Sequence, residues 1–121
     1  SSKFVSMKVS VLSSGSKGNT TYIESNNVKI LIDLGNTSKY VKEKLEDLGV
    51  FPGDIDAILI THTHVDHIGG LKIFAKKYNI PVYITEVMHK TLDYIDNYKC
   101  LHTSYLKYKL FRFKINNHQI H

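Results

Sequence analysis

The sequence is short of cysteine and of long apolar runs. Its single cysteine, Cys100, cannot form a disulfide within the chain, which favours a reducing compartment, and we expect a cytoplasmic protein. Uninterrupted apolar runs are far shorter than the ~20 residues that cross a bilayer as a helix. No basic start followed by an apolar stretch indicates a signal peptide. A membrane-spanning class is therefore not expected.

Composition places the chain among ordinary globular proteins. It has 121 residues, 42% hydrophobic and 22% charged, which suits one domain with a modest core. Lysine and arginine number 16 against 11 acidic residues, an excess that would suit an anionic substrate such as a phosphodiester. A solvated surface rich in lysine explains the same excess, so charge alone selects no substrate. Residues 1–6 are interpreted as a leader left by cloning, with Met7 as the native start.

Hydrophobic periodicity predicts strands first and then strands alternating with helices. We expect a hairpin with Asn26 and Asn27 at its tip, and a helix that Ser38 caps and Gly49 ends. The predicted strands cover 8–13, 20–24, 29–33, 57–60, 81–85 and 106–115, and the predicted helices cover 38–48, 71–78 and 86–95. This order indicates an α/β fold with a mixed sheet and helices on at least one face.

Four ligand-type side chains lie within the six residues His62-Thr63-His64-Val65-Asp66-His67, directly after the apolar strand at 57–60. In extended backbone, residues two apart point the same way, so His62 and His64 can face one ion. Asp66 and His67 are expected on the turn that follows, facing the same pocket. Gly69 and Gly70 would let the backbone pass close to whatever is bound there. A polar loop of surface histidines is the alternative, but this spacing at a strand end favours a metal site, because burying these groups unpaired would be costly.

The segment His62–His67 resembles the HxHxDH signature of the metallo-β-lactamase superfamily. Asp33, in Ile32-Asp33-Leu34-Gly35, matches an earlier aspartate of that superfamily, and residues 11–19 and 80–83 are similar to the YycJ (WalJ) branch. The resemblance implies an αββα sandwich, with residues 7–121 as the N-terminal half of the fold.

The resemblance also implies a mechanism. Two divalent metal ions, zinc or manganese, would activate a water molecule. His62 and His64 would bind the first ion, and Asp66 and His67 the second. Asp66 would also act as the catalytic residue that guides the proton of the attacking water. Asp33 would orient the metal loop without binding metal. Nucleic-acid phosphodiesters are the expected substrates, in the manner of an exonuclease.

The superfamily completes each metal site with later residues, and none can be assigned here. His118 and His121 form an HxxH pattern, which we interpret as part of a polar turn rather than as the third ligand. His89 and His102 are interpreted as structural. The turn at 14–19, with Lys17, could hold a phosphate, but glycines in a tight strand connection explain it more simply.

Two other functions remain open. One is hydrolysis of a different substrate, such as a thioester, another ester, a lactone or a β-lactam. The other is a non-catalytic half-domain that lacks a complete site. The strands at 9–12, 30–32 and 57–60 carry more apolar residues than the predicted helices can cover. The chain is therefore expected to expose an apolar patch and to self-associate.

Overall fold

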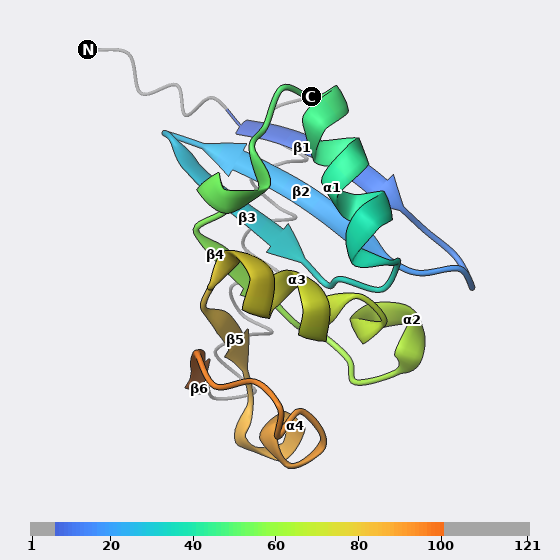
Figure 1. The fold of residues 1–121 in the computed structure, drawn as a ribbon, viewed down its shortest axis with the longest axis vertical. Helices are drawn as coiled ribbons and strands as arrows, with labels where there is room; N and C mark the ends of the chain where they lie inside the picture. The colour runs from blue at the N-terminus through green and yellow to red at the C-terminus, as the bar shows by residue number, and fades with distance from the viewer. Residues whose placement is uncertain (1–6, 101–121) are drawn as a thin grey trace.

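The computed structural model of the chain describes residues 7–100 (Figure 1). It contains six strands, four α-helices and a short 3-10 helix within that range. The strands are β1 (Met7–Ser13), β2 (Thr20–Ser25), β3 (Val28–Ile32), β4 (Ala57–Leu59), β5 (Val82–Ile84) and β6 (Tyr98–Cys100). The helices are α1 (Ser38–Asp47), η1 (Pro52–Asp54), α2 (Val65–Ile68), α3 (Leu71–Tyr78) and α4 (Glu86–Thr91).

The six strands form one mixed sheet in the order β1-β2-β3-β4-β5-β6. The pairs β1–β2 and β2–β3 are antiparallel, and the pairs from β3 to β6 are parallel. The hairpin between β2 and β3 has the predicted tip, because Asn26 and Asn27 take positive φ values of 50° and 69°. Asparagine tolerates this left-handed conformation better than most residues, and it is the one that tight hairpin turns require.

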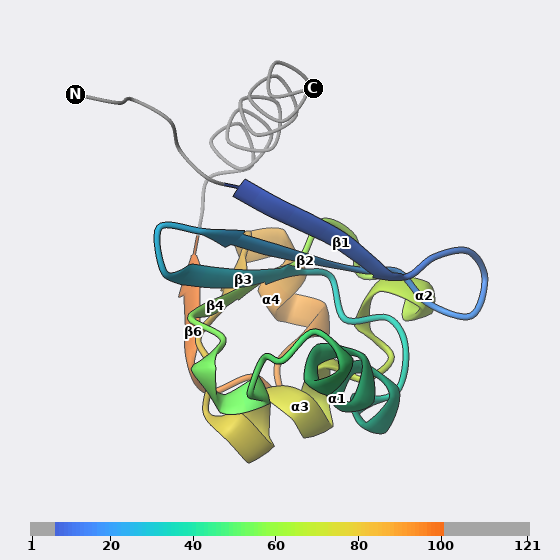
Figure 2. The ribbon, with the colours of Figure 1, turned by 90° about the horizontal axis from the view of Figure 1, so that it is seen from above.

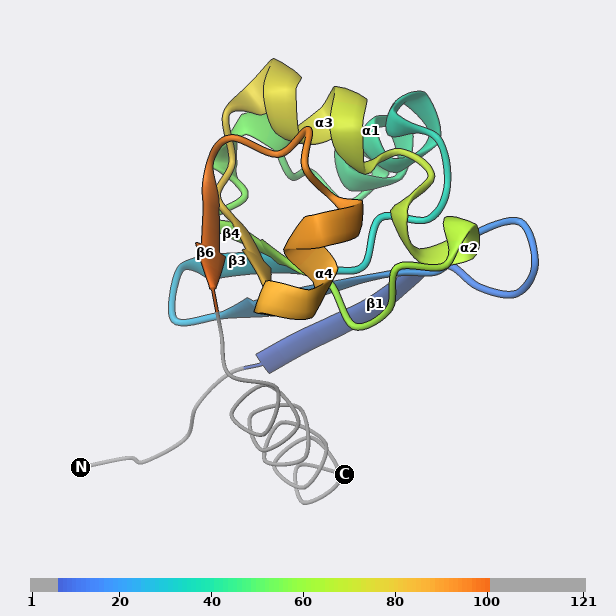
Figure 3. The same ribbon diagram turned by 90° about the horizontal axis from the view of Figure 1, so that it is seen from below.

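Helices α1 and α3 cover one face of the sheet (Figures 2 and 3). On that face Tyr22, Leu31, Ile58 and Val82 are paired across four neighbouring strands, and each is at most 2% exposed. Together with buried side chains of both helices they belong to one core cluster. The core therefore lies between the sheet and the helices, as the hydrophobic pattern predicted.

Several element boundaries differ from the predicted ones. Thr37, and not Ser38, caps α1, since its side chain accepts a hydrogen bond from the Tyr40 amide at 3.1 Å. The helix predicted over 86–95 ends at Thr91, because Leu92 leaves helical geometry with ψ near 44°. Strand β6 was not predicted. The strand predicted over 106–115 lies outside the described residues, as do His102, His118 and His121.

Candidate metal centre

The predicted metal loop begins where two parallel strands end. Strand β3 runs into Asp33 and strand β4 runs into Ile60 and Thr61, so the ends of both strands meet at one edge of the sheet. The Asp33 amide extends this pairing by donating a hydrogen bond to the Leu59 carbonyl oxygen at 2.7 Å. Ligand sites in open α/β sheets commonly lie at this edge, beyond the carboxyl ends of the strands. The sheet therefore places Asp33 directly beside the histidine segment.

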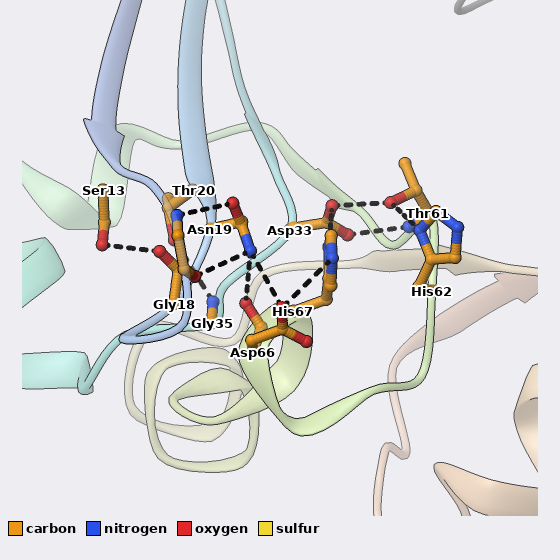
Figure 4. A network of polar contacts seen from close by, with 11 residues as sticks. Ser13, Gly18, Asn19, Thr20, Asp33, Gly35, Thr61, His62, Asp66 and His67 are labelled. Carbon is orange, nitrogen blue, oxygen red and sulfur yellow. Dashed lines mark hydrogen bonds and ion pairs between the residues drawn. The ribbon is translucent and has the colours of Figure 1, made fainter.

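Asp33 contacts Thr61, which precedes the histidine segment, and His67, which ends it (Figure 4). Its Oδ1 accepts a hydrogen bond from the Thr61 amide at 2.7 Å. Its Oδ2 accepts one from Thr61 Oγ1 at 2.6 Å and lies 2.7 Å from His67 Nδ1. The residue is only 5% exposed and has a φ of 63°, a strained conformation that the surrounding contacts must hold in place. Asp33 is thus a buried carboxylate fixed by several hydrogen bonds.

These contacts determine which nitrogens of two histidines carry a proton. A carboxylate only accepts hydrogen bonds, so His67 Nδ1 must be the donor to Asp33. The single hydroxyl proton of Thr61 is used toward Asp33. Thr61 Oγ1 can therefore only accept from His62 Nδ1, which lies 3.0 Å away. In neutral His62 and His67, Nε2 is then the unprotonated nitrogen that can bind a metal.

The backbone around Asp66 and His67 is held by hydrogen bonds from two other segments of the chain. The Asn19 amide donates to the Asp66 carbonyl oxygen at 2.6 Å, and the Leu34 amide donates to the His67 carbonyl oxygen at 2.9 Å. Asp66 Oδ2 lies 3.8 Å from His67 Nε2. Both residues were expected on a turn, but they lie in the short helix α2. The helix brings the carboxylate of Asp66 close to the free nitrogen of His67.

Glycines allow this segment to approach the chain that follows β3. A Cβ on Gly35 would overlap the carbonyl oxygen of Asp66, and one on Gly70 would overlap the carbonyl oxygen of Asn36. Gly69 and Gly70 were expected to give a ligand room, but in the structure they give room to the backbone at Gly35 and Asn36.

His62 and His64 lie in a more open setting. Both side chains are exposed. Their ring centroids are 6.1 Å apart, and His62 lies 4.9 Å from His67 by the same measure. Within residues 7–100, no three histidine, cysteine or acidic side chains converge as a ready metal site. The donor set of imidazole and carboxylate groups nonetheless suits zinc, and the exposed rings of His62 and His64 have room to turn.

A family model described as "Metallo-beta-lactamase superfamily" matches residues 14–100. The chain belongs to this superfamily. It is 41% identical over 97 residues to the exodeoxyribonuclease WalJ of Streptococcus pneumoniae, which covers 80% of this chain and 35% of the relative. It is 37% identical over 86 residues to the exodeoxyribonuclease YycJ of Bacillus anthracis, covering 71% of this chain and 33% of the relative. The expected resemblance to this branch is thereby confirmed.

A solved superfamily structure agrees with the fold. The metallo-beta-lactamase-type protein of Thermotoga maritima has a TM-score of 0.63 and 27% identity, over 78% of this chain and 58% of that protein. The predicted fold class is confirmed, with this chain covering the N-terminal part of the superfamily fold. The chain spans about a third of the length of the two exodeoxyribonucleases.

Two residues that contact the candidate site were missed in the sequence. Thr61 links Asp33 to His62, and Asn19 contacts Asp66 from the turn between β1 and β2. Threonine and a turn asparagine are common in ordinary loops, so neither carries a signal without the structure. His89 stacks on Tyr98 with ring centroids 4.0 Å apart, in keeping with a structural histidine.

The turn at 14–19 has the tight geometry that glycine provides. Gly15 and Gly18 have φ values of 88° and 134°, and a Cβ on Gly18 would overlap the Asn36 amide nitrogen. These observations favour the structural explanation of the turn over a phosphate site. Lys17 is exposed within it.

Proposed function

We propose that this chain carries the first half of the active site of a metal-dependent nuclease that hydrolyses phosphodiesters. His62 and His64 hold one divalent ion in this proposal, and Asp66 and His67 hold a second. Two such ions, when bound, lower the pKa of water and stabilise the charge that develops on the phosphodiester. Zinc is the favoured metal and manganese the alternative. The hydrogen bonds that leave Nε2 of His62 and His67 unprotonated are the structural observation that supports metal binding.

The protein's own residues have separate roles in this proposal. Asp33 and Thr61 orient the two imidazoles, because their hydrogen bonds fix the rings and their protons. The Asp66 carboxylate accepts the proton of the attacking water and directs that water toward the phosphorus atom. The nucleic-acid substrate class is supported by the two exodeoxyribonuclease relatives. The net charge of the described residues does not add support, because basic and acidic side chains balance within residues 7–100. The basic excess corresponds to residues outside that range, namely Lys3, Lys107, Lys109, Arg112 and Lys114.

The test uses the intact protein that carries this chain. The protein is stripped of metal, reloaded with Zn²⁺ or Mn²⁺, and assayed for release of nucleotides from end-labelled DNA. We expect activity only after reloading, and a loss greater than ~100-fold in His67→Ala, beyond the range typical of residues that merely support a ligand. His89→Ala is the matched control and should retain activity. Equal activity with and without metal would contradict the proposal, and faster cleavage of a thioester or β-lactam would reassign the substrate.

Self-association and a cytoplasmic location stay predictions. The sheet face opposite α1 and α3 exposes Val9 at 37% and Val11 at 65%, and Ile30, Ile32 and Leu59 are half-buried. Exposed apolar surface of this kind favours association. Sedimentation of the 121-residue chain in dilute solution should therefore detect dimers, and a stable monomer would contradict the expectation. No helix within residues 7–100 has the length and apolar character needed to cross a membrane.

A further inference from the structure

The side chain of Asn19 connects the turn between β1 and β2 to the predicted metal loop (Figure 4). Its Nδ2 donates to the Asp66 carbonyl oxygen at 3.2 Å and to Asp66 Oδ2 at 3.3 Å. Its Oδ1 accepts a hydrogen bond from the Gly15 amide at 3.2 Å, and Nδ2 also reaches the Gly15 carbonyl oxygen at 3.3 Å. One amide group thus contacts both its own turn and a residue 47 positions away.

The Asp66 carboxylate depends on this contact. Among residues 7–100, Asn19 is the one residue that donates a side-chain hydrogen bond to it. The Asp66 side chain is 34% exposed, so surrounding packing alone does not fix its orientation. Because a carboxylate on a single bond rotates freely without partners, a hydrogen bond to one oxygen decides which way the other oxygen points.

The backbone keeps Asn19 at this place. The Asn19 amide donates to the Asp66 carbonyl oxygen at 2.6 Å, and the Gly35 amide donates to the Asn19 carbonyl oxygen at 3.0 Å. The lack of a side chain at Gly35 lets the three segments meet, since a Cβ there would overlap both Asp66 and Asn19. Main-chain hydrogen bonds therefore hold Asn19 in place, and its side-chain amide group lies beside Asp66 as a result.

We propose that Asn19 is a positioning residue that orients the Asp66 carboxylate for metal binding. The inference rests on the proposed function, in which Asp66 and His67 hold one of two ions. Asn19 then acts on Asp66 as Asp33 acts on His67, and the pair is held from two sides. Closing the turn does not require this role, because the acceptor toward Gly15 could equally belong to aspartate or serine.

The experiment compares three variants of the intact, metal-free protein by calorimetric titration with Zn²⁺. Asn19→Ala removes all side-chain contacts. Asn19→Asp keeps the acceptor for Gly15 but sets a second carboxylate against Asp66. Asn36→Ala is the matched control, because Asn36 Nδ2 donates to Ser13 Oγ at 3.1 Å in the same region and makes no hydrogen bond to Asp66. Thermal unfolding without metal measures the purely structural effect of each change.

We expect one zinc equivalent to bind ~10–100-fold more weakly in Asn19→Ala, and at least as weakly in Asn19→Asp. Asn36→Ala should lower thermal stability without changing zinc affinity. If Asn19→Ala does not fold, Asn19→Ser replaces it, because serine can still close the turn but is too short to reach Asp66. Zinc affinity equal to that of the unsubstituted protein in both Asn19 variants would overturn the inference alone. Absence of zinc binding by the unsubstituted protein would instead overturn the proposed function, and the inference with it.

Discussion

The two halves of the segment from His62 to His67 differ in how firmly they are held. Asp66 and His67 lie in helix α2, and their carbonyl oxygens accept hydrogen bonds from Asn19 and Leu34. His67 also binds the buried carboxylate of Asp33. His62 and His64 have exposed side chains, and within the described residues the one side-chain hydrogen bond of His62 is with Thr61.

This difference divides the proposed site into two parts. One part is already ordered before a metal binds, and the other would become ordered on binding. In the proposed site, the Asp66–His67 half needs little rearrangement to bind a metal, because its supporting hydrogen bonds already exist. The His62–His64 half keeps rotational freedom, which metal binding would have to restrict. Supporting residues of the held half should therefore influence both folding and metal affinity. Residues of the open half should influence metal affinity alone.

Removal of the Asp33 carboxylate should cause the largest loss of stability and zinc affinity. Asp33→Ala leaves the Thr61 amide and His67 Nδ1 without their acceptor, at ~1–3 kcal/mol for each group that stays buried. We also expect zinc affinity to fall by ~10–100-fold. Asp33→Asn is the matched variant, since asparagine tolerates the positive φ and keeps one acceptor oxygen. It should recover most of the stability, measured by denaturant unfolding, but not the affinity. Full recovery of affinity would show that the charge of Asp33 is unimportant.

Closing the gap at Gly35 should have the next largest effect. In Gly35→Ala the new methyl group would push Asp66 and Asn19 apart, and we expect a loss of ~1–3 kcal/mol in unfolding free energy together with weaker zinc binding. Gly49→Ala is the control, because a Cβ on Gly49 would meet open space, and its positive φ of 75° strains alanine without a clash. It should lose stability without any change in zinc affinity. If Gly35→Ala bound zinc normally, the close approach would not matter for the site.

The histidines themselves give a smaller and more direct contrast. In metal-free protein, His67→Ala removes a partner of buried Asp33 and should cost ~1–3 kcal/mol of stability. His64→Ala changes an exposed side chain and should stay within ~0.5 kcal/mol. Equal losses in the two variants would mean that the two halves are held alike.

A carboxylate far from the metal loop gives the smallest effect and a useful reference. Tyr22 donates a hydrogen bond to Glu24 at 2.6 Å, which holds the pKa of Glu24 below its ordinary 4.5. The stability from this bond is present above that ordinary pKa and is lost as the pH falls through the lowered value. Tyr22→Phe should therefore unfold more easily near neutral pH, and the difference should shrink in acid. A constant difference at every pH would show that the bond does not favour ionised Glu24.

Much of the fold could be predicted because local patterns determine it. Alternating residues gave strands β1 to β3, and the two asparagines at the hairpin tip adopt the positive φ values that such a turn needs. Predictions were poorer after residue 85. The periodicity of Met88, Leu92 and Ile95 predicted one long helix, but only α4 forms. Leu92 and Ile95 are buried from the irregular segment that follows it. The burial of Leu92 and Ile95 was predicted correctly but their backbone conformation was not. A longer helix and the observed irregular segment would both place these side chains in the core.

The candidate site was predictable only where its residues are neighbours in sequence. The spacing of ligand-type residues from His62 to His67 was enough to predict a metal site, and Asp33 was found through the resemblance to a family. Thr61 had no such signal, and Asn19 lay at the end of the resembling segment 11–19 with nothing that marked it as a contact of Asp66. Asn19 contacts Asp66 only because the fold brings together two residues that are 47 positions apart in the sequence. The role of Thr61 depends on one hydroxyl group, which donates its proton to Asp33 and accepts a hydrogen bond from His62. Tertiary contacts of this kind require the structure.

We propose that Asp33 prepares His67, and through Thr61 also His62, to bind a metal with Nε2. Long-range ¹H–¹⁵N correlation spectra of the metal-free protein report directly which ring nitrogen carries the proton in each neutral histidine. We expect His62 and His67 to be protonated at Nδ1, with Nε2 free, and Asp33→Ala to abolish this preference. A proton on Nε2 of His67 in the unsubstituted protein would contradict this role of Asp33.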